Sequence, residues 1–309
     1  MSQMIDFTLP SSAPGRMLHA FRCVPEGEVR AIVQLSHGMV EFIDRYKPLA
    51  EYLAARGILV TGNDHLGHGG SIRTRADYGY FAEPDGNRTV LDDLHAMTVL
   101  TKQLYPGVPY FLLGHSMGSF LLRTYLYTSP DAVDKAVISG TGWEDPTKVR
   151  LGKLVCRLEQ ARVGETSTSK LVTKLMFGSY NKPFGAVTSP NAWICSDEAV
   201  VAAYDADPLC GFDATVGLTR DMLTGISMNQ RKENLEKMDK ALPVPFVSGM
   251  QDPVGAMGEG VLRCIDAFKR AGLKNVTIRL YPEGRHEMLN ETNRTEVYAD
   301  ILAWLEKRL

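Results

Sequence analysis

The sequence lacks the features that would place it in several large classes of protein. Its 309 residues include five cysteines, an odd number with no Cys-x-x-Cys pair, which argues against a disulfide framework or a zinc site. No stretch approaches the roughly 18 apolar residues of a membrane span, and the first residues lack the basic and apolar regions of a signal peptide. The formal net charge of −2 creates no overall field that would attract nucleic acid. We therefore expect a globular protein of the cytoplasm without a nucleic-acid partner.

Buried-strand patterns alternate with helical patterns in the first 140 residues and again after residue 238. This alternation predicts an α/β fold with a mostly parallel, doubly wound sheet. Residues 4–24 are predicted to form a hairpin of two edge strands. Residues 141–238 contain no buried-strand pattern, only helical patterns and aromatic-rich loops. The sequence therefore predicts a core in two parts, residues 1–140 and 239–309, interrupted by a helical cap at residues 141–238.

The segment Gly114-His115-Ser116-Met117-Gly118 joins an apolar run of strand length to a helical pattern. A serine between two glycines at a strand-to-helix turn is typical of the nucleophile of an α/β-hydrolase. The glycines suit a tight turn in which a Cβ atom would collide with neighbouring backbone. The pattern is common by itself, but its position between a strand and a helix makes Ser116 a candidate nucleophile.

A serine nucleophile needs a histidine base, and the base needs a carboxylate that orients it. In α/β-hydrolases these groups follow in the order serine, acid, histidine, each in a loop after a strand. Asp252 follows the apolar run that ends at Gly249, and His286 follows the run that ends at Leu280. Either residue alone could be an ordinary loop residue. Their order and positions predict a catalytic triad of Ser116, Asp252 and His286.

Acyl transfer also requires donors for the negatively charged oxygen of the transition state. One donor in this fold is the backbone amide after the nucleophile, here that of Met117. The second comes from the loop after an early strand, and His37-Gly38-Met39 lies there. We therefore predict an oxyanion hole formed by the amides of Met39 and Met117, whose side chains could shape the acyl pocket or simply pack in the core.

Several other polar residues are weaker candidates. His65 and His68 could suggest a metal, but no carboxylate or cysteine recurs at ligand spacing, so we expect neither a metal nor another cofactor. Glu41 and Arg45 are four residues apart. They could form an ion pair that braces the oxyanion loop, or an ordinary solvated pair.

The predicted cap contains a basic amphipathic pattern at residues 148–163. Its apolar members recur at helical spacing, namely Leu151, Leu154, Val155 and Leu158. Such a helix can lie on an anionic membrane, which would give the protein a transient membrane contact. We favour the alternative in which the apolar face packs inward and the charges are solvated.

Several motifs occur in the order found in a known family. They are His37-Gly38-Met39-Val40-Glu41, Arg45-Tyr46, Asp64-His65-Leu66-Gly67-His68-Gly69-Gly70-Ser71 and Gly114-His115-Ser116-Met117-Gly118. In these motifs the chain resembles the monoacylglycerol lipase and lysophospholipase branch of the α/β-hydrolases, which is catalogued with the serine aminopeptidase S33-like hydrolases. The resemblance is close over residues 25–140 and good over residues 243–308. Residues 197–212 look like the cap of bacterial lysophospholipase-like members.

The resemblance implies the triad and oxyanion roles already given, and a substrate pocket beneath the cap. Candidates for the pocket are His37, His115, Phe177, Trp193 and Tyr204, although the aromatic residues could instead fill a small core within the cap. The sequence departs from the family pattern at Phe42, where histidine is frequent, and at Ser119, where glycine is frequent. Neither departure touches the chemistry, but both could alter the pocket.

The function expected is hydrolysis of carboxylic esters with an apolar acyl chain, such as monoacylglycerols or lysophospholipids. One alternative is an aminopeptidase or amidase, whose substrate amine would need cap carboxylates such as Glu198, Asp205 and Asp207. Another is a non-catalytic ligand-binding member, because fold alone does not determine function. The expected partner is a small ester or lipid.

Overall fold

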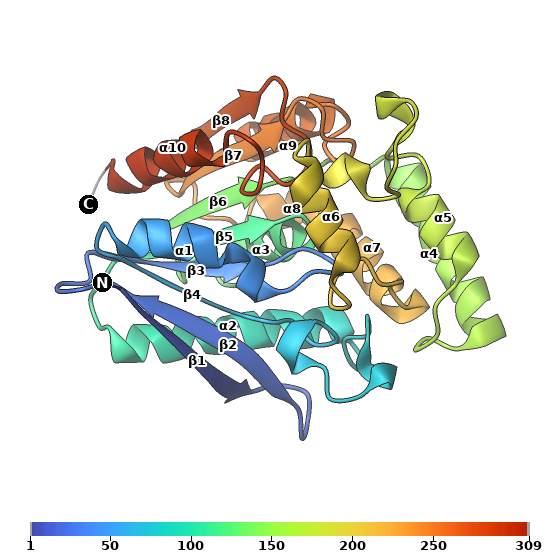
Figure 1. The fold of residues 1–309 in the computed structure, drawn as a ribbon, viewed down its shortest axis with the longest axis horizontal. Coiled ribbons are helices and arrows are strands. Elements are labelled where there is room, and N and C mark those ends of the chain that lie inside the picture. The colour runs from blue at the N-terminus through green and yellow to red at the C-terminus, as the bar shows by residue number, and fades with distance from the viewer. Residues whose placement is uncertain (1, 308–309) are drawn as a thin grey trace.

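The computed structural model of the chain describes residues 2–307. Its strands are β1 (Gln3–Pro10), β2 (Met17–Val24), β3 (Ala31–Ser36), β4 (Ile58–Asn63), β5 (Tyr110–His115), β6 (Lys135–Ser139), β7 (Pro243–Gly249) and β8 (Asn275–Tyr281). They form one sheet in the order β1-β2-β4-β3-β5-β6-β7-β8 (Figure 1). All neighbouring strands from β4 to β8 are parallel, whereas β1 and β2 are antiparallel to their neighbours. The predicted α/β fold with a mostly parallel sheet is confirmed.

The N-terminal hairpin lies at one edge of the sheet. β1 pairs with β2 along its whole length, and residues 20–23 of β2 also pair with β4. The prediction of two edge strands is therefore wrong for β2. The reason is visible in its burial, because Ala20, Phe21 and Cys23 are fully buried and need cover on both faces of the sheet.

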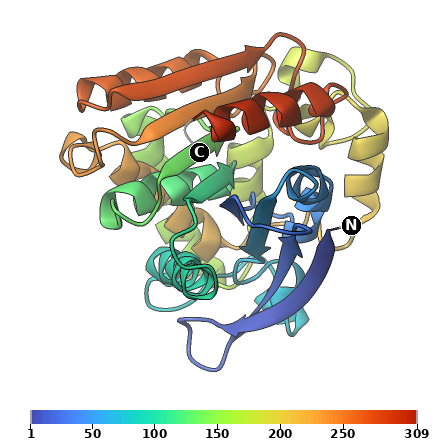
Figure 2. The same ribbon diagram turned by 90° about the vertical axis from the view of Figure 1, so that its left-hand side faces the viewer.

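Two layers of helices cover the sheet. α1 (Lys47–Ala54) and α10 (Arg294–Glu306) pack on one face, and α2 (Gly86–Leu104), α3 (Met117–Thr128) and α9 (Glu259–Arg270) pack on the other. Successive side chains of a strand point to opposite faces. Accordingly, Ile32 of β3 packs in the hydrophobic core beneath α2, α3 and α9, whereas Val33 and Leu35 pack in the core beneath α1 and α10. Figure 2 shows the sheet running diagonally between the two layers.

Residues 141–238, which we call the cap segment, are mainly helical. They contain α4 (Pro146–Val163), α5 (Lys170–Phe177), α6 (Glu198–Ala206), α7 (Val216–Asn229) and α8 (Lys232–Leu235). α7 packs against α3, and the Asn229 side chain donates to the Phe120 carbonyl at 3.2 Å. α4 and α5 lie at the far side of α7 from the sheet (Figure 1). The division of the chain at residues 140 and 238 stays a prediction.

Most of the predicted apolar face of α4 is exposed. Leu151, Leu154 and Leu158 are 61%, 51% and 63% exposed, so the prediction that this face packs inward is wrong for the three leucines. Val155 is partly buried and packs against the core. The face that packs against α7 includes Gly152, whose Cβ position would lie 3.0 Å from Leu223 Cδ1. Small residues allow two helices to approach closely. The positions of the leucines alone could not show that α4 packs through the face that carries Gly152. None of the helices described within residues 2–307 is both long and apolar enough to cross a membrane.

The contact between α3 and the end of β3 leaves no room for a side chain at Gly118. A Cβ atom there would lie 2.0 Å from the Ser36 carbonyl oxygen. We expect Gly118→Ala to lower the free energy of unfolding by about 1–3 kcal/mol, because backbone of β3 must move. Urea denaturation followed by circular dichroism would measure this loss of stability.

Gly152→Ala is the matched control. Its added Cβ would meet only the end of the flexible Leu223 side chain, and alanine favours a helix over glycine by about 1 kcal/mol. We expect this variant to equal or exceed the wild type in stability. Equal losses in both variants would contradict the close α3–β3 contact.

Candidate active site

The five residues predicted to act in catalysis lie at one edge of the sheet, with Met117 directly after Ser116 at the start of α3. Ser116 follows β5, Met39 lies in the turn after β3, and Asp252 and His286 lie in the loops after β7 and β8. Because these strands are parallel, their carboxyl ends lie at the same edge. Ligands of open α/β sheets bind outside this edge.

Ser116 occupies a strained turn. Its φ of 52° and ψ of −120° are unfavourable for a residue with a side chain. The Ser116 amide donates to the Ser139 carbonyl at 3.0 Å, and the Ser119 amide and hydroxyl donate to the Ser116 carbonyl at 2.9 and 2.6 Å. The serine at position 119 therefore adds a hydrogen bond that glycine could not make, and it helps to hold the turn.

His286 and Asp252 form a buried pair. His286 Nδ1 lies 3.0 Å from both carboxylate oxygens of Asp252. The Val254 amide also donates to Asp252 Oδ1 at 2.8 Å, which fixes the carboxylate. His286 Nε2 is buried and makes no hydrogen bond within residues 2–307. The carboxylate thus orients the ring and leaves Nε2 free to accept a proton, as in a histidine base.

The neighbouring charges favour a proton on His286. Burial of the ring opposes its charged form, but the Asp252 carboxylate outweighs burial, with smaller contributions from Glu287 and Glu41, and raises the pKa of His286. His115 lies beside it, with 4.8 Å between the ring centroids. Burial, followed by the nearby His286, keeps the pKa of His115 well below its usual value. Of these two rings, only His286 has a pKa that its neighbours raise.

The turn after β3 lies against Ser116. A Cβ atom at Gly38 would stand 3.2 Å from Ser116 Cβ. The Gly38 amide donates to Glu41 Oε1 at 2.5 Å, whereas the Met39 amide has no acceptor in the described part of the chain. Met117 is the first residue of α3, where an amide lacks an acceptor within the helix. The two amides predicted to form the oxyanion hole are therefore free of competing acceptors within their own elements.

A buried ion cluster connects this turn to the histidine loop. Arg45 Nη1 lies 2.5 Å from Glu41 Oε2, and its two Nη atoms contact both oxygens of Glu287 at 2.7 and 2.6 Å. Glu41 is buried and the Arg45 side chain is only 13% exposed, so the alternative of a solvated pair is wrong. Burial raises the pKa of Glu41, whereas for Glu287 burial is outweighed by Arg45, which lowers its pKa. Glu287 was not among the predicted site residues, although its position directly after His286 was a signal.

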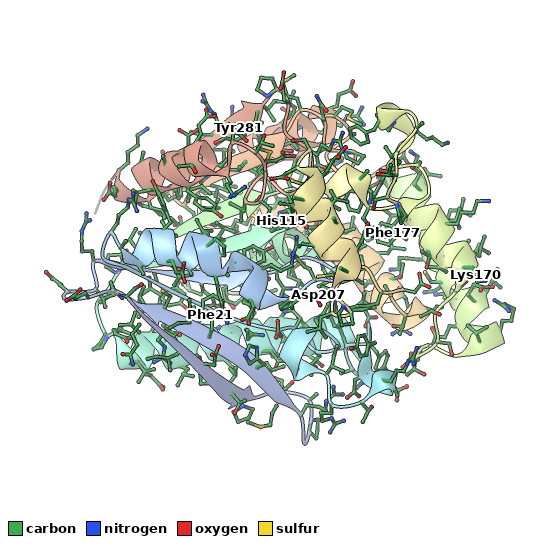
Figure 3. All side chains as sticks on the ribbon, viewed as in Figure 1. Phe21, His115, Lys170, Phe177, Asp207 and Tyr281 are labelled. Carbon is green, nitrogen blue, oxygen red and sulfur yellow. The ribbon has the colours of Figure 1, made fainter. Side chains whose placement is uncertain are left out.

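Trp193 and Phe177 come together near the candidate base. The Trp193 ring centroid lies 5.0 Å from that of His286, and Phe177 stacks on Trp193 at 6.2 Å. Tyr180 joins them, 4.8 Å from Trp193. Figure 3 places Phe177 in the cap segment to one side of the centrally located His115. These aromatic residues form an apolar wall beside His286.

Three other predicted pocket residues are used internally. His37 is fully buried, with Nδ1 2.7 Å from the Gly38 carbonyl and Nε2 accepting from the His65 amide. His115 Nδ1 contacts the Ser139 hydroxyl at 3.2 Å. The Tyr204 hydroxyl donates to the Val40 carbonyl at 2.9 Å. The structure therefore does not place the polar atoms of His37 and Tyr204 where they could bind a substrate.

Potential metal ligands meet at one place within residues 2–307, where single ligand atoms of Asp6, His19 and Asp44 lie within 4.8 Å of one another. Lys47 Nζ lies 2.7 Å from Asp44 Oδ2, so a protein cation already stands beside this group. His65 and His68 are neutral, because burial lowers the pKa of His65 to about 3 and of His68 to about 4.

Comparison with known proteins identifies the family of the chain. A family model described as serine aminopeptidase, S33, matches residues 27–293. The chain belongs to this family of α/β-hydrolases. The resemblance inferred from the motifs is thereby confirmed.

Two curated relatives and one solved structure narrow the branch. A monoacylglycerol lipase of Mycolicibacterium smegmatis is 27% identical over 293 residues, 92% of this chain and 91% of that protein. The monoglyceride lipase of Homo sapiens is 26% identical over 313 residues, 96% of this chain and 89% of that protein. A thermostable carboxyl esterase from Bacillus coagulans superposes with a TM-score of 0.91 at 27% identity, covering 99% of this chain and 98% of that one. The chain is thus an ester-hydrolysing enzyme of the monoglyceride lipase-like branch.

The pH dependence of activity should report the charge on His286. A histidine base acts in its neutral form, so activity should rise with pH through its pKa, which Asp252 raises above the usual value of about 6.5. We expect the acid limb of kcat/KM for a p-nitrophenyl ester to have its midpoint above that value. In Asp252→Asn the midpoint should fall and the plateau should drop.

Asp300→Asn, a change on the surface of α10, serves as the control and should leave the acid limb in place. A wild-type midpoint below about 6.5, or an upward shift in Asp252→Asn, would contradict the assigned cause.

Proposed function

We propose that this enzyme cleaves carboxylic esters with an apolar acyl chain, such as monoacylglycerols or lysophospholipids, through an acyl-enzyme on Ser116. The observation that carries the proposal is the pair formed by His286 and Asp252, in which Nε2 is free. Ser116 and the Met39 amide face the same edge of the sheet as this pair. A nucleophile, a base, an acid and oxyanion donors at one edge of the sheet are the groups that this proposed chemistry requires.

In the proposed mechanism, Ser116 Oγ attacks the ester carbonyl while His286 Nε2 takes its proton. The amides of Met39 and Met117 stabilise the negative charge that develops on the carbonyl oxygen. When the tetrahedral intermediate collapses, the bond to the alcohol breaks and His286 donates the proton to the leaving oxygen. A water molecule, activated by the same histidine, then releases the acid from Ser116.

The surroundings of Met117 are mostly apolar, which suits an acyl chain. A cavity of about 10 Å³ lies beside it, between α2, α3 and α7, lined by Phe81, Asn87, Met117, Phe120, Leu121, Met222 and Gly225. An acyl chain could enter only if these side chains move, and the unbranched methionines can adapt their shape. The relatives named for monoacylglycerol hydrolysis support this class of substrate.

The aminopeptidase alternative receives no support from the cap carboxylates. Asp205 accepts from Ser189 and Asn191 at 2.5 and 2.7 Å on the exposed surface of α6. Asp207 accepts from the Leu209 amide at 2.9 Å, and Glu198 is exposed at the start of α6. None of the three carboxylates is held toward Ser116 by a described contact.

The role of Ser116 can be tested by substitution. We expect Ser116→Ala to lower the hydrolysis of a p-nitrophenyl ester by at least about a thousandfold, because the variant has no nucleophile. The wild type should be labelled by a fluorophosphonate, and the variant should not. Circular dichroism would check that the fold is unchanged.

Ser119→Ala is the control, because it removes a neighbouring hydroxyl that donates to the Ser116 carbonyl. It should still be labelled. A wild type that is not labelled would favour the non-catalytic alternative, and turnover of an amino-acid amide faster than any ester from acetate to palmitate would favour the amidase.

We further propose that the cap segment makes transient contact with an anionic lipid surface. Leu171 and Leu175 of α5 are exposed like the three leucines of α4. Exposed cations flank these leucines, namely Lys148, Arg150, Arg157, Arg162, Lys170 and Lys174. Figure 3 shows Lys170 at the outer side of the cap. Leucines that enter the lipid boundary and cations that face anionic head groups are the two contributions such binding needs.

The cytoplasmic location stays a prediction.

Replacing Leu151, Leu154 and Leu158 together by serine should weaken binding to phosphatidylglycerol vesicles by about tenfold or more, since each buried leucine contributes on the order of 1 kcal/mol or more. Vesicle sedimentation would measure this, with phosphatidylcholine vesicles as the uncharged comparison. Leu104→Ser with Leu262→Ser is the control, because both leucines are exposed outside the cap. Equal losses in the two variants, or none in the first, would contradict a cap-specific contact.

A further inference from the structure

Val40, the residue after Met39, has a strained backbone. Val40 has a φ of 53°, in the left-handed region that a β-branched residue rarely adopts. Strain of this kind persists only where surrounding contacts hold it. The conformation of Val40 matters because it directs the peptide chain on one side of the Met39 amide.

Two groups of the cap segment hold the Val40 carbonyl. The Tyr204 hydroxyl of α6 and the Gly211 amide both donate to it at 2.9 Å. A carbonyl oxygen has two lone pairs, so both of its acceptor positions are occupied. Tyr204 is 6% exposed, and its ring lies against Gly211, where a Cβ atom would stand 3.1 Å from Tyr204 Cε1.

The other side of Met39 is held from the core. Glu41 accepts from the Gly38 amide at 2.5 Å and from the Tyr46 hydroxyl at 2.8 Å. Arg45, which pairs with Glu41, also lies over the Tyr204 ring, with its guanidinium carbon 4.8 Å from the ring centroid. Gly38 and Val40, the two neighbours of Met39, are therefore fixed by one connected set of contacts, half of which comes from the cap.

We propose that Tyr204 is a positioning residue through which the cap segment holds the Met39 amide in place as an oxyanion donor. The inference rests on the proposed function of Met39 and extends it. The cap then has a part in stabilising the transition state, besides any part in covering the substrate. Tyr204 acts through Val40 and touches neither substrate nor reacting atoms, in contrast to the substrate contact expected from the sequence.

The test is Tyr204→Phe, which keeps the ring over Gly211 and under Arg45 but removes the hydroxyl. We expect kcat for a p-nitrophenyl ester to fall by about tenfold with KM changed less than about twofold, because the loss concerns only the transition state. Affinity for an alkyl trifluoromethyl ketone, whose adduct with Ser116 carries an oxyanion, should fall in the same ratio. Affinity for the product fatty acid and the acid limb of the pH profile should not change.

Tyr125→Phe is the matched control. Its ring is as buried, and its hydroxyl donates to Thr98 Oγ1 at 3.2 Å and lies 2.8 Å from His95 Nδ1, on the face of α3 that packs on α2. It should match Tyr204→Phe in urea denaturation, yet keep wild-type kcat and ketone affinity. A second variant, Gly211→Ala, strains the other donor to Val40 at a φ of 64° and should lower kcat and ketone affinity together.

The outcomes separate the two proposals. If Tyr204→Phe raises KM and leaves kcat unchanged, Tyr204 is a substrate contact and the inference is overturned. It is also overturned if kcat is unchanged, or if ketone affinity stays constant while kcat falls. If the wild type neither hydrolyses esters nor reacts with a fluorophosphonate at Ser116, the proposed function itself fails, and that result is visible before any variant is made.

Discussion

The active site depends on a close backbone contact between the start of α3 and the end of β3. Gly118 approaches the Ser36 carbonyl so closely that no Cβ atom fits between them. This contact brings the turn that carries Ser116 against the turn that carries Met39. An oxyanion hole made of two backbone amides cannot adjust through side-chain rotation, so the distance between the two turns must be set by packing of the backbone itself.

Packing alone does not orient the Met39 amide, because the turn after β3 has no regular secondary structure. The protein supplies that orientation through polar contacts within the turn and from two segments distant in sequence, the cap and the histidine loop. Glu41 accepts from the Gly38 amide, and Tyr204 of the cap donates to the Val40 carbonyl. Arg45 pairs with Glu41, lies over the Tyr204 ring and also pairs with Glu287 in the histidine loop. The Glu287 amide in turn donates to the Ile194 carbonyl of the cap at 2.7 Å. The two loops that carry out the proposed chemistry are thus held by the same contacts.

The sequence predicts the parts of this site that follow from local patterns. Ser116, Asp252 and His286 could be proposed as a triad because each follows an apolar strand, and parallel strands bring such positions to one edge. The contact of Arg45 with Glu287 spans 242 residues and has no local pattern. The exposure of the α4 leucines could not be predicted either, because periodicity defines an apolar face but not the neighbouring element that covers it. The sequence predicts Tyr204 only as an aromatic residue of the pocket. Its contact with the Val40 carbonyl joins positions far apart in the sequence and has no local pattern.

The charges of the cluster contribute to chemistry as well as geometry. One guanidinium lies between two carboxylates, so Arg45 balances only part of the negative charge beside His286. The remainder, added to Asp252, favours the imidazolium that the proposed mechanism requires when Ser116 loses its proton. Because the groups are buried, solvent and salt screen this interaction weakly. A lysine at position 45 could supply the charge but not the planar pair of donors that spans both oxygens of Glu287 while also reaching Glu41. Arginine is therefore the residue type that meets the geometric and the electrostatic requirement together.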